Sequence, residues 1–168
     1  IQGKGEVPLR ALVKNALRMR PDRIILGEAR GGEALDVIQA MHSGHDGVMT
    51  VLHANTGRAA LERLQTLMML SGLDLSPSAC RMQINGAVEL IIHLSRYADG
   101  SRKITTISQL TGVTPEGFEM EDIFRIEAKG YSGEGKLESG LHYTGVVPSF
   151  LSKFRMANVE LPSWVKTE

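Results

Sequence analysis

The chain has 168 residues, of which 42% are hydrophobic and 23% are charged, enough for one domain with a real core. Its 19 basic and 19 acidic side chains give a formal net charge of zero, which argues against a nucleic-acid partner. The single cysteine excludes an internal disulfide, and no apolar run approaches the ~20 residues that span a bilayer, so we expect a cytoplasmic protein without direct membrane insertion.

The first predicted element is an amphipathic helix within residues 6–21. Leu9, Val13 and Ala16 fall on one helical face, and Pro21 ends the segment. Its polar face and its exit carry a cluster of basic side chains, for which a solvated helix face is the simplest account. Because they approach the next strand, three members of the cluster are also candidates for a nucleotide or neighbouring-subunit contact: Arg18, Arg20 and Arg23.

A strand, a helix and a second strand follow. Residues 24–26 are a short apolar run rich in β-branched side chains, which predicts a strand buried on both faces. Apolar residues at Leu35, Ile38 and Met41 predict a crossover helix, and residues 48–52 predict a second strand. A right-handed crossover of this length returns the second strand parallel to the first. The sequence therefore predicts a βαβ unit.

An ionisable side chain follows each predicted strand, Glu28 after the first and His53 after the second. Open parallel sheets bind ligands beyond the carboxyl ends of their strands, so both residues should face one crevice. A carboxylate there can orient or deprotonate the water that attacks a magnesium-bound triphosphate, and histidine can donate a hydrogen bond to a phosphoryl oxygen. Alternatively, Glu28 is a solvated residue and His53 a capping or structural one. The two together favour phosphate chemistry.

Three motifs within residues 17–64 carry a family resemblance. They are GEARGGE at 27–33, GHDG at 44–47 and LHAN at 52–55. The run closely resembles the secretion ATPases of type II and type IV secretion and type IV pilus systems, and most of all the tight-adherence (Tad, or Flp) pilus assembly motor. By eye the resemblance extends over residues 6–128. It implies a RecA-like P-loop NTPase core, hence an α/β fold.

The resemblance also implies roles for individual residues. Residues 24–28 become the Walker B element, with Glu28 as the catalytic glutamate that reaches magnesium through water. Residues 44–55 become the histidine box, in which His53 contacts the γ-phosphate. His45 is a second site candidate in that box, although the His-Asp-Gly that it starts could equally form a structural turn.

Three further arginines are candidates for nucleotide or interface contacts. Arg30 could hold Glu28 by an ion pair or face a phosphate across a subunit boundary. Arg58 and Arg63 resemble the recurring arginines that follow the histidine box in this family, where a structural ion pair is the alternative to a nucleotide or interface role.

One family motif has no counterpart in the sequence. No GxxxxGK[ST] phosphate loop occurs, and the nearest string, at residues 3–5, lacks both the spacing and the Ser or Thr. We therefore expect a single, partial RecA-like domain at 1–168, a carboxyl-terminal portion that lacks the Walker A loop and is inactive alone. Its expected parts are a Walker B and histidine-box half, a β-rich half, and a helical carboxyl-terminal tail: 1–71, 86–145 and 146–168.

After residue 86 the pattern changes to strands. Two β-rich runs flank Asp99-Gly100, which predicts a hairpin. Further strands are predicted at 117–128 and 137–144, and a helix at 148–156. We expect these antiparallel strands to extend the parallel βαβ sheet.

The resemblance implies a subunit of a hexameric motor that uses Mg²⁺ and ATP and couples hydrolysis to pilus assembly or protein secretion. Such a motor works in the cytoplasm, held peripherally at the inner membrane by a platform protein. The missing phosphate loop supports a different function, a noncatalytic module that joins the ring or binds the platform without hydrolysing ATP. A nucleic-acid motor is disfavoured by the neutral charge and by the pairing of GEARGGE with GHDG.

Overall fold

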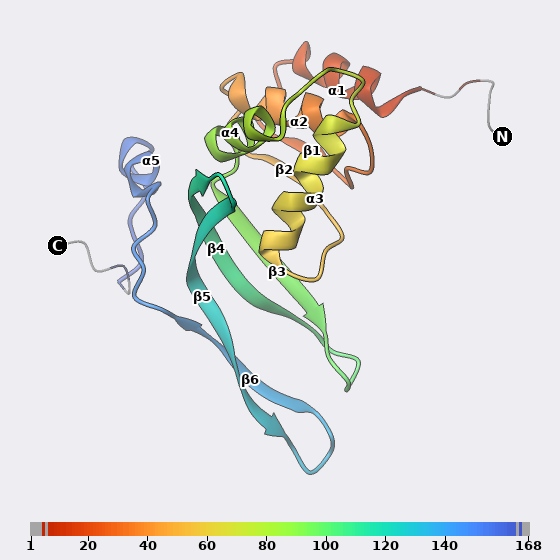
Figure 1. The fold of residues 1–168 in the computed structure, drawn as a ribbon. Helices are drawn as coiled ribbons and strands as arrows, with labels where there is room; N and C mark the ends of the chain where they lie inside the picture. Colours follow the sequence, from red (N-terminus) through yellow and green to blue (C-terminus); the bar gives the residue numbers. More distant parts are fainter. Residues whose placement is uncertain (1–4, 6, 164, 166–168) are drawn as a thin grey trace. The chain divides into compact units, whose positions relative to one another are not determined.

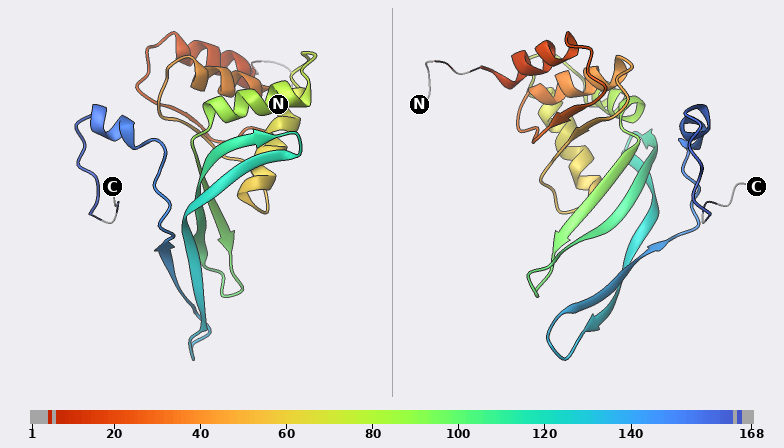
Figure 2. Two further views of the ribbon diagram at one scale, coloured as in Figure 1. Left: turned by 60° about the vertical axis from the view of Figure 1, so that its left-hand side comes forward. Right: turned by 180° about the vertical axis from the view of Figure 1, so that it is seen from behind.

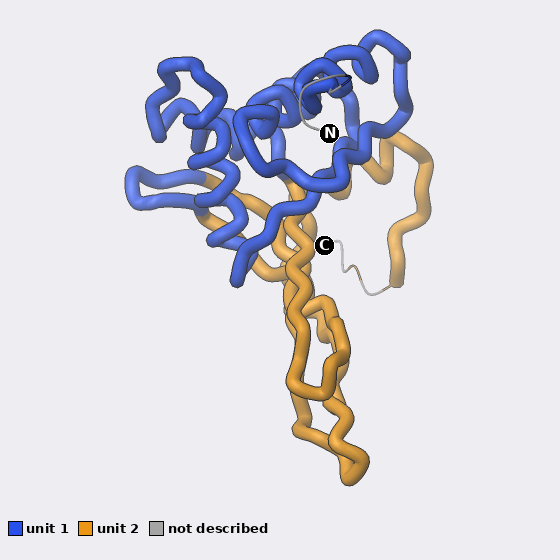
Figure 3. Tube along the Cα trace, turned by 90° about the vertical axis from the view of Figure 1, so that its right-hand side faces the viewer, with its two compact units in different colours: residues 1–88, 113–118 blue, residues 89–112, 119–168 orange. Residues whose placement is uncertain are grey.

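The computed structural model describes residues 5, 7–163 and 165. Backbone contacts divide the chain into two compact units, coloured separately in Figure 3. Unit 1 comprises residues 1–88 and 113–118, and unit 2 comprises residues 89–112 and 119–168. In the part of the chain that is described, no helix is long and apolar enough to cross a membrane.

Unit 1 combines helices with a short parallel sheet (Figure 1). β1 and β2 pair in parallel, with Ile24 opposite Val48 and Leu26 opposite Thr50. The predicted βαβ unit is therefore confirmed, and both strands end at the same edge of the sheet. In chain order the elements are α1 (Leu9–Leu17), β1 (Ile24–Leu26), α2 (Glu33–His42), β2 (Val48–Thr50), α3 (Gly57–Met69) and α4 (Pro77–Ala87).

The crossover helix α2 forms the centre of the core of unit 1. It packs against α1, α3 and α4, and the views in Figure 2 show the red α1 beside the orange α2. Leu35 and Ile38 are buried, as the helical spacing predicts, and so are Val37 and Ala40. Because apolar residues lie on more than one face, this helix can contact several neighbours at once.

The sheet of unit 1 is covered on one face only. Ile24 and Leu26 are each 8% exposed, whereas Ile25 is 71% exposed and its neighbour Met49 is 50% exposed. The prediction that the first strand is buried on both faces is therefore wrong for this chain. Alternate residues of a strand point to opposite faces, and the described residues that pack on the sheet cover only the face of Ile24 and Leu26.

Gly32 allows α2 to begin close to the end of α3. A Cβ on Gly32 would lie 2.7 Å from the Cα of Ser71 and 3.1 Å from the carbonyl oxygen of Leu70, both backbone atoms. We expect Gly32→Ala to lower the free energy of unfolding by about 1–3 kcal/mol, measured by urea denaturation. Gly133→Ala is the control, because a Cβ there meets no atom within 4 Å. An equal loss in both variants would contradict this packing.

Unit 2 is built on an antiparallel sheet with the strand order β3-β4-β5-β6. The predicted hairpin at Asp99-Gly100 is confirmed, since β3 and β4 pair in antiparallel fashion on either side of it. Asp99 also accepts the N–H of Leu137 at 2.8 Å, which ties this turn to the start of β6. The elements are β3 (Leu90–Arg96), β4 (Arg102–Thr114), β5 (Gly117–Tyr131), β6 (Leu137–Tyr143) and α5 (Leu151–Met156).

The antiparallel strands do not continue the parallel sheet. Among the described residues, β1 and β2 form one sheet and β3 to β6 form another. The prediction that they extend the parallel sheet is therefore wrong. A hairpin turn predicts that the two strands on either side of it pair with each other. It does not predict whether those strands also pair with another sheet.

Candidate functional site

Glu28 lies just past β1 and meets two basic side chains, one at each carboxylate oxygen. Its Oε2 accepts a hydrogen bond from Nε of Arg30 at 2.7 Å, and Nη2 of Arg30 lies 2.6 Å from the same oxygen. Its Oε1 lies 3.3 Å from Nε2 of His53, which follows β2. The structure thus places Glu28 and His53 together at the carboxyl ends of neighbouring parallel strands.

The cationic surroundings keep Glu28 ionised. Its hydrogen bond from Arg30 lowers the pKa of Glu28 below the usual range, and the charges of Arg30, His53 and Arg63 act in the same direction. The same hydrogen bond raises the pKa of Arg30. The Glu28 side chain is 18% exposed, whereas those of Arg30 and His53 are 77% and 74% exposed. A ligand can therefore reach both basic groups from solvent.

Three hydrogen bonds from backbone N–H groups shape the loop that carries Glu28 and Arg30. The N–H of Ala29 donates to the carbonyl of Val51 at 3.1 Å, which continues the parallel pairing beyond β1. Oε1 of Glu33 accepts the N–H groups of Arg30 at 2.7 Å and Gly31 at 2.9 Å. The loop therefore turns back, so that the side chain of Arg30 meets the carboxylate two residues before it.

Glu33 is a site residue that sequence reasoning missed. Its partial burial pushes the pKa up, but backbone N–H groups, led by that of Arg30, outweigh this effect, so the pKa of Glu33 lies below the usual range. An acidic residue in the first turn of a helix, directly after a glycine pair, was the available signal, because carboxylates there accept free backbone N–H groups.

Residues 43–47 form a turn at the amino end of β2. Nδ1 of His45 lies 2.9 Å from Oγ of Ser43, and Gly44 and Gly47 have φ angles of 83° and 89°. Arg23, which precedes β1, packs here as well, because a Cβ on Gly47 would lie 2.7 Å from its Nη1. His45 and Arg23 are therefore at the amino ends of the two strands, opposite Glu28 and His53.

Two more basic candidates lie in the connection between α1 and β1. Arg18 is the carboxyl-terminal cap of α1, and Arg20 has a positive φ of 51°. Both side chains are exposed. This connection enters β1 at its amino end, so the structure does not bring either residue to Glu28, and their nucleotide or subunit contacts stay predictions.

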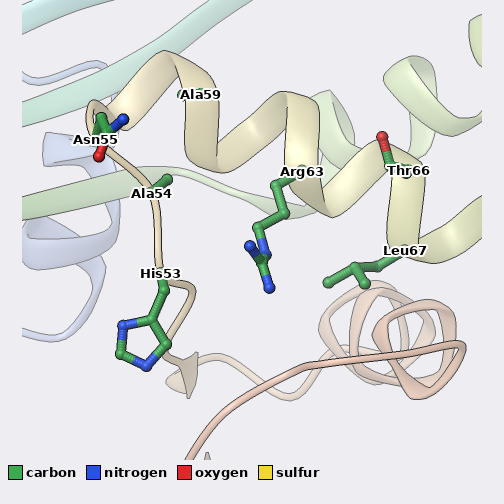
Figure 4. A pocket seen from close by; sticks show the side chains of 7 residues that line it. All are labelled: His53, Ala54, Asn55, Ala59, Arg63, Thr66 and Leu67. Carbon is green, nitrogen blue, oxygen red and sulfur yellow. The ribbon is translucent and has the colours of Figure 1, made fainter.

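Arg58 and Arg63 of α3 have different surroundings. Arg58 donates from Nη1 to the carbonyl oxygen of Phe118, which ties the start of α3 to the hairpin tip at 113–118. Arg63 extends from α3 towards the space beside His53, where an open pocket of about 790 Å³ lies (Figure 4). Of these two arginines, Arg63 therefore lies beside Glu28 and His53, and Arg58 does not. The pocket is lined by His53, Ala54, Asn55, Ala59, Arg63, Thr66 and Leu67.

The described residues do not form a metal site by themselves. Within them, no three His, Cys, Asp or Glu side chains gather where they could hold an ion together. Both oxygens of Glu28 also face basic groups. A magnesium ion beside Glu28 would therefore take most of its ligands from phosphate oxygens and water, which is the arrangement that Mg²⁺ favours with nucleotides.

The chain is similar to known proteins of one family. The model of the family described as type II/IV secretion system protein matches residues 1–137. The type IV secretion system protein VirB11 of Bartonella henselae is 40% identical over 108 residues, which are 63% of this chain and 30% of that protein. The conjugal transfer protein TrbB of Rhizobium radiobacter is 35% identical over 121 residues, 72% of this chain and 36% of that protein.

A solved structure is similar as well. The VirB11 ATPase from the Brucella suis type IV secretion system, crystallised with sulphate, superposes with a TM-score of 0.57 and 33% identity. The match covers 60% of this chain and 31% of that one. The RecA-like α/β fold predicted from the sequence is therefore confirmed, and the chain spans about a third of the length of the relatives that it matches.

Proposed function

Because this chain belongs to the type II/IV secretion system protein family, we propose that it is part of an ATPase motor that drives pilus assembly or protein secretion. The observation that carries the proposal is the pair of Glu28 and His53. Oε1 of Glu28 lies 3.3 Å from Nε2 of His53, and the two residues follow adjacent parallel strands. Ligands of open α/β sheets bind at this edge, and phosphoryl transfer needs a carboxylate and a hydrogen-bond donor there.

In the proposed reaction, Glu28 orients the attacking water and accepts its proton. His53 donates a hydrogen bond to a phosphoryl oxygen and so favours the charge that develops there. Mg²⁺, when bound with ATP, supplies further positive charge at the phosphates. Residues 24–28 serve as the Walker B element, and Arg63 lies close enough to share a phosphate with His53. A phosphate-binding loop has to come from outside these 168 residues.

The proposal extends to assembly and location. We place the chain in a hexameric, cytoplasmic ring, held at the inner membrane by a platform protein, as the resemblance implies. The residues of GEARGGE, GHDG and LHAN support the tight-adherence pilus motor as the particular kind of motor. Arg18, Arg20, Arg23 and His45, at the amino ends of the strands, are then better suited to a neighbouring subunit than to the nucleotide beside Glu28.

A noncatalytic module that joins the ring without hydrolysing ATP is the second candidate. Two observations favour it, the absence of a phosphate loop from the 168 residues and the Arg30 ion pair on the carboxylate of Glu28. In this case the chain would bind its partners but show no turnover in any form.

Phosphate release distinguishes the two functions. We expect a longer form of the protein that carries a phosphate-binding loop to hydrolyse Mg-ATP. We expect the 168-residue chain alone to show no measurable hydrolysis, because its sequence contains no phosphate-binding loop to hold the β- and γ-phosphates. No turnover by the longer form, despite nucleotide binding, would overturn the motor and support the noncatalytic module.

A further inference from the structure

The contact between Arg30 and Glu28 conflicts with the proposed role of Glu28 as the acceptor of a proton from water. Two nitrogens of the guanidinium, Nε and Nη2, lie within 2.7 Å of the same carboxylate oxygen, Oε2. A carboxylate in such an ion pair is a weaker proton acceptor, because its protonation would break the ion pair. The other oxygen already faces His53 at 3.3 Å. Glu28 is therefore held in a form that does not favour abstraction of a proton from water.

The fold anchors the backbone of Arg30 but not its guanidinium. Glu33 holds the N–H of Arg30 at 2.7 Å and that of Gly31 at 2.9 Å. The Arg30 side chain is 77% exposed, and Glu28 is the acceptor of its hydrogen bond. A change of rotamer is enough to move the guanidinium away, because no packing has to be broken.

A phosphate oxygen at this edge would compete with Glu28 for Arg30. Guanidinium groups bind phosphate through two parallel N–H donors, and a triphosphate carries more negative charge than one carboxylate. His53 and Arg63 already face the same space, so positive charge gathers there. Arg30 contacts the carboxylate more closely than His53 does, at 2.6 Å against 3.3 Å.

Building on the function proposed above, we propose that Arg30 is a positioning residue that gates Glu28. Arg30 holds the carboxylate while no nucleotide is bound and turns to a phosphate oxygen of the bound triphosphate, which leaves Oε2 of Glu28 free to accept a proton from water. With this gate, Oε2 of Glu28 is available as a proton acceptor only while a triphosphate is bound. Glu33 supports the gate by fixing the backbone from which Arg30 turns.

The first test needs no activity and uses the 168-residue chain without nucleotide. We would follow the pH titration of the Glu28 side-chain carboxyl by ¹³C NMR. Arg30 lowers the pKa of Glu28, so Arg30→Gln should raise the titration midpoint, Arg30→Lys should raise it less, and Glu33→Ala should raise it as well by loosening the loop. The basic side chains that face Glu28 from other elements, those of His53 and Arg63, are unaltered in all three variants.

Arg125→Gln is the matched control for this titration. Arg125 makes a similar ion pair, 2.7 Å from Nη2 to Oδ2 of Asp122, and its side chain is 67% exposed, but it lies in β5, in unit 2. The Glu28 midpoint should not move in this variant. An unchanged midpoint in both Arg30→Gln and Arg30→Lys would mean that the ion pair does not form in solution, and it would overturn the gate.

The second test determines whether Arg30 leaves the Glu28 carboxylate when nucleotide binds. In a longer, active form, kcat/KM reports the free enzyme and kcat reports the nucleotide complex. Arg30→Gln should therefore shift the acidic limb of the kcat/KM profile to higher pH and leave the acidic limb of kcat in place. Equal shifts in both profiles would show that Arg30 stays on Glu28 throughout the cycle and would overturn the gate. Absence of hydrolysis in the unaltered longer form would count against the proposed function, while the NMR titration would still decide whether Arg30 binds Glu28.

Discussion

Replacing Glu28 with Gln should lower the kcat for ATP hydrolysis by about 10²–10⁴-fold and leave nucleotide binding intact. Glutamine has nearly the same shape as glutamate and can still accept a hydrogen bond, but it cannot take a proton from water. The ion pair with Arg30 would also be lost, and Arg30 would then be free to bind phosphate. Steady-state phosphate release and the Kd of a fluorescent nucleotide, both in a longer form with a phosphate-binding loop, measure the two effects separately.

The chain contains a matched control for this substitution. Glu127 also lies near a histidine, with its Oε2 3.4 Å from Nε2 of His142, but this pair lies on β5 and β6. Glu127→Gln should leave kcat unchanged. Full turnover in Glu28→Gln, or an equal loss in Glu127→Gln, would remove Glu28 from the proposed chemistry.

Replacing His53 with Ala should lower kcat by about 10²–10³-fold, the usual cost of losing one donor to the developing charge of a transition state. KM should change much less, because the hydrogen bond strengthens as charge moves onto the phosphoryl oxygens. His53 is 74% exposed, so its removal takes little buried surface from the fold. The change is therefore expected in the rate of hydrolysis and not in stability.

His142→Ala is the corresponding control, since His142 makes the same kind of contact with a glutamate in unit 2. Initial rates over a range of ATP concentrations separate kcat from KM in each variant. A parallel loss of binding and rate in His53→Ala, or a fall in thermal stability of the same size as the loss in activity, would assign His53 a structural role.

The sequence predicts much of unit 1, because the decisive signals there are local. Short apolar runs rich in β-branched residues identify both strands, and the spacing of Leu35 and Ile38 identifies the crossover helix between them. A crossover of this length fixes the strands as parallel, and parallel strands end at one edge. The meeting of Glu28 and His53 follows from these rules without any knowledge of side-chain contacts.

Other features of the structure depend on relations that a local pattern does not contain. Exposure of Ile25 reflects which segments lie over the sheet, and whether the hairpin strands join the parallel sheet depends on pairing with strands that are distant in the sequence. The sequence left two possibilities for Arg30, and the structure shows an ion pair with Glu28. That pair accompanies a turn in which Glu33 accepts two backbone N–H groups, and the direction in which the Arg30 side chain leaves the turn is not contained in a local pattern.

Whether Glu28 and His53 act as one hydrolytic site is tested most directly by the kcat of the double variant Glu28→Gln/His53→Ala. Groups that act as a unit show strongly non-additive losses, so the double variant should be about as slow as the slower of the two single variants. Losses that multiply in the double variant would show that the residues act independently, and they would contradict the account of a shared site.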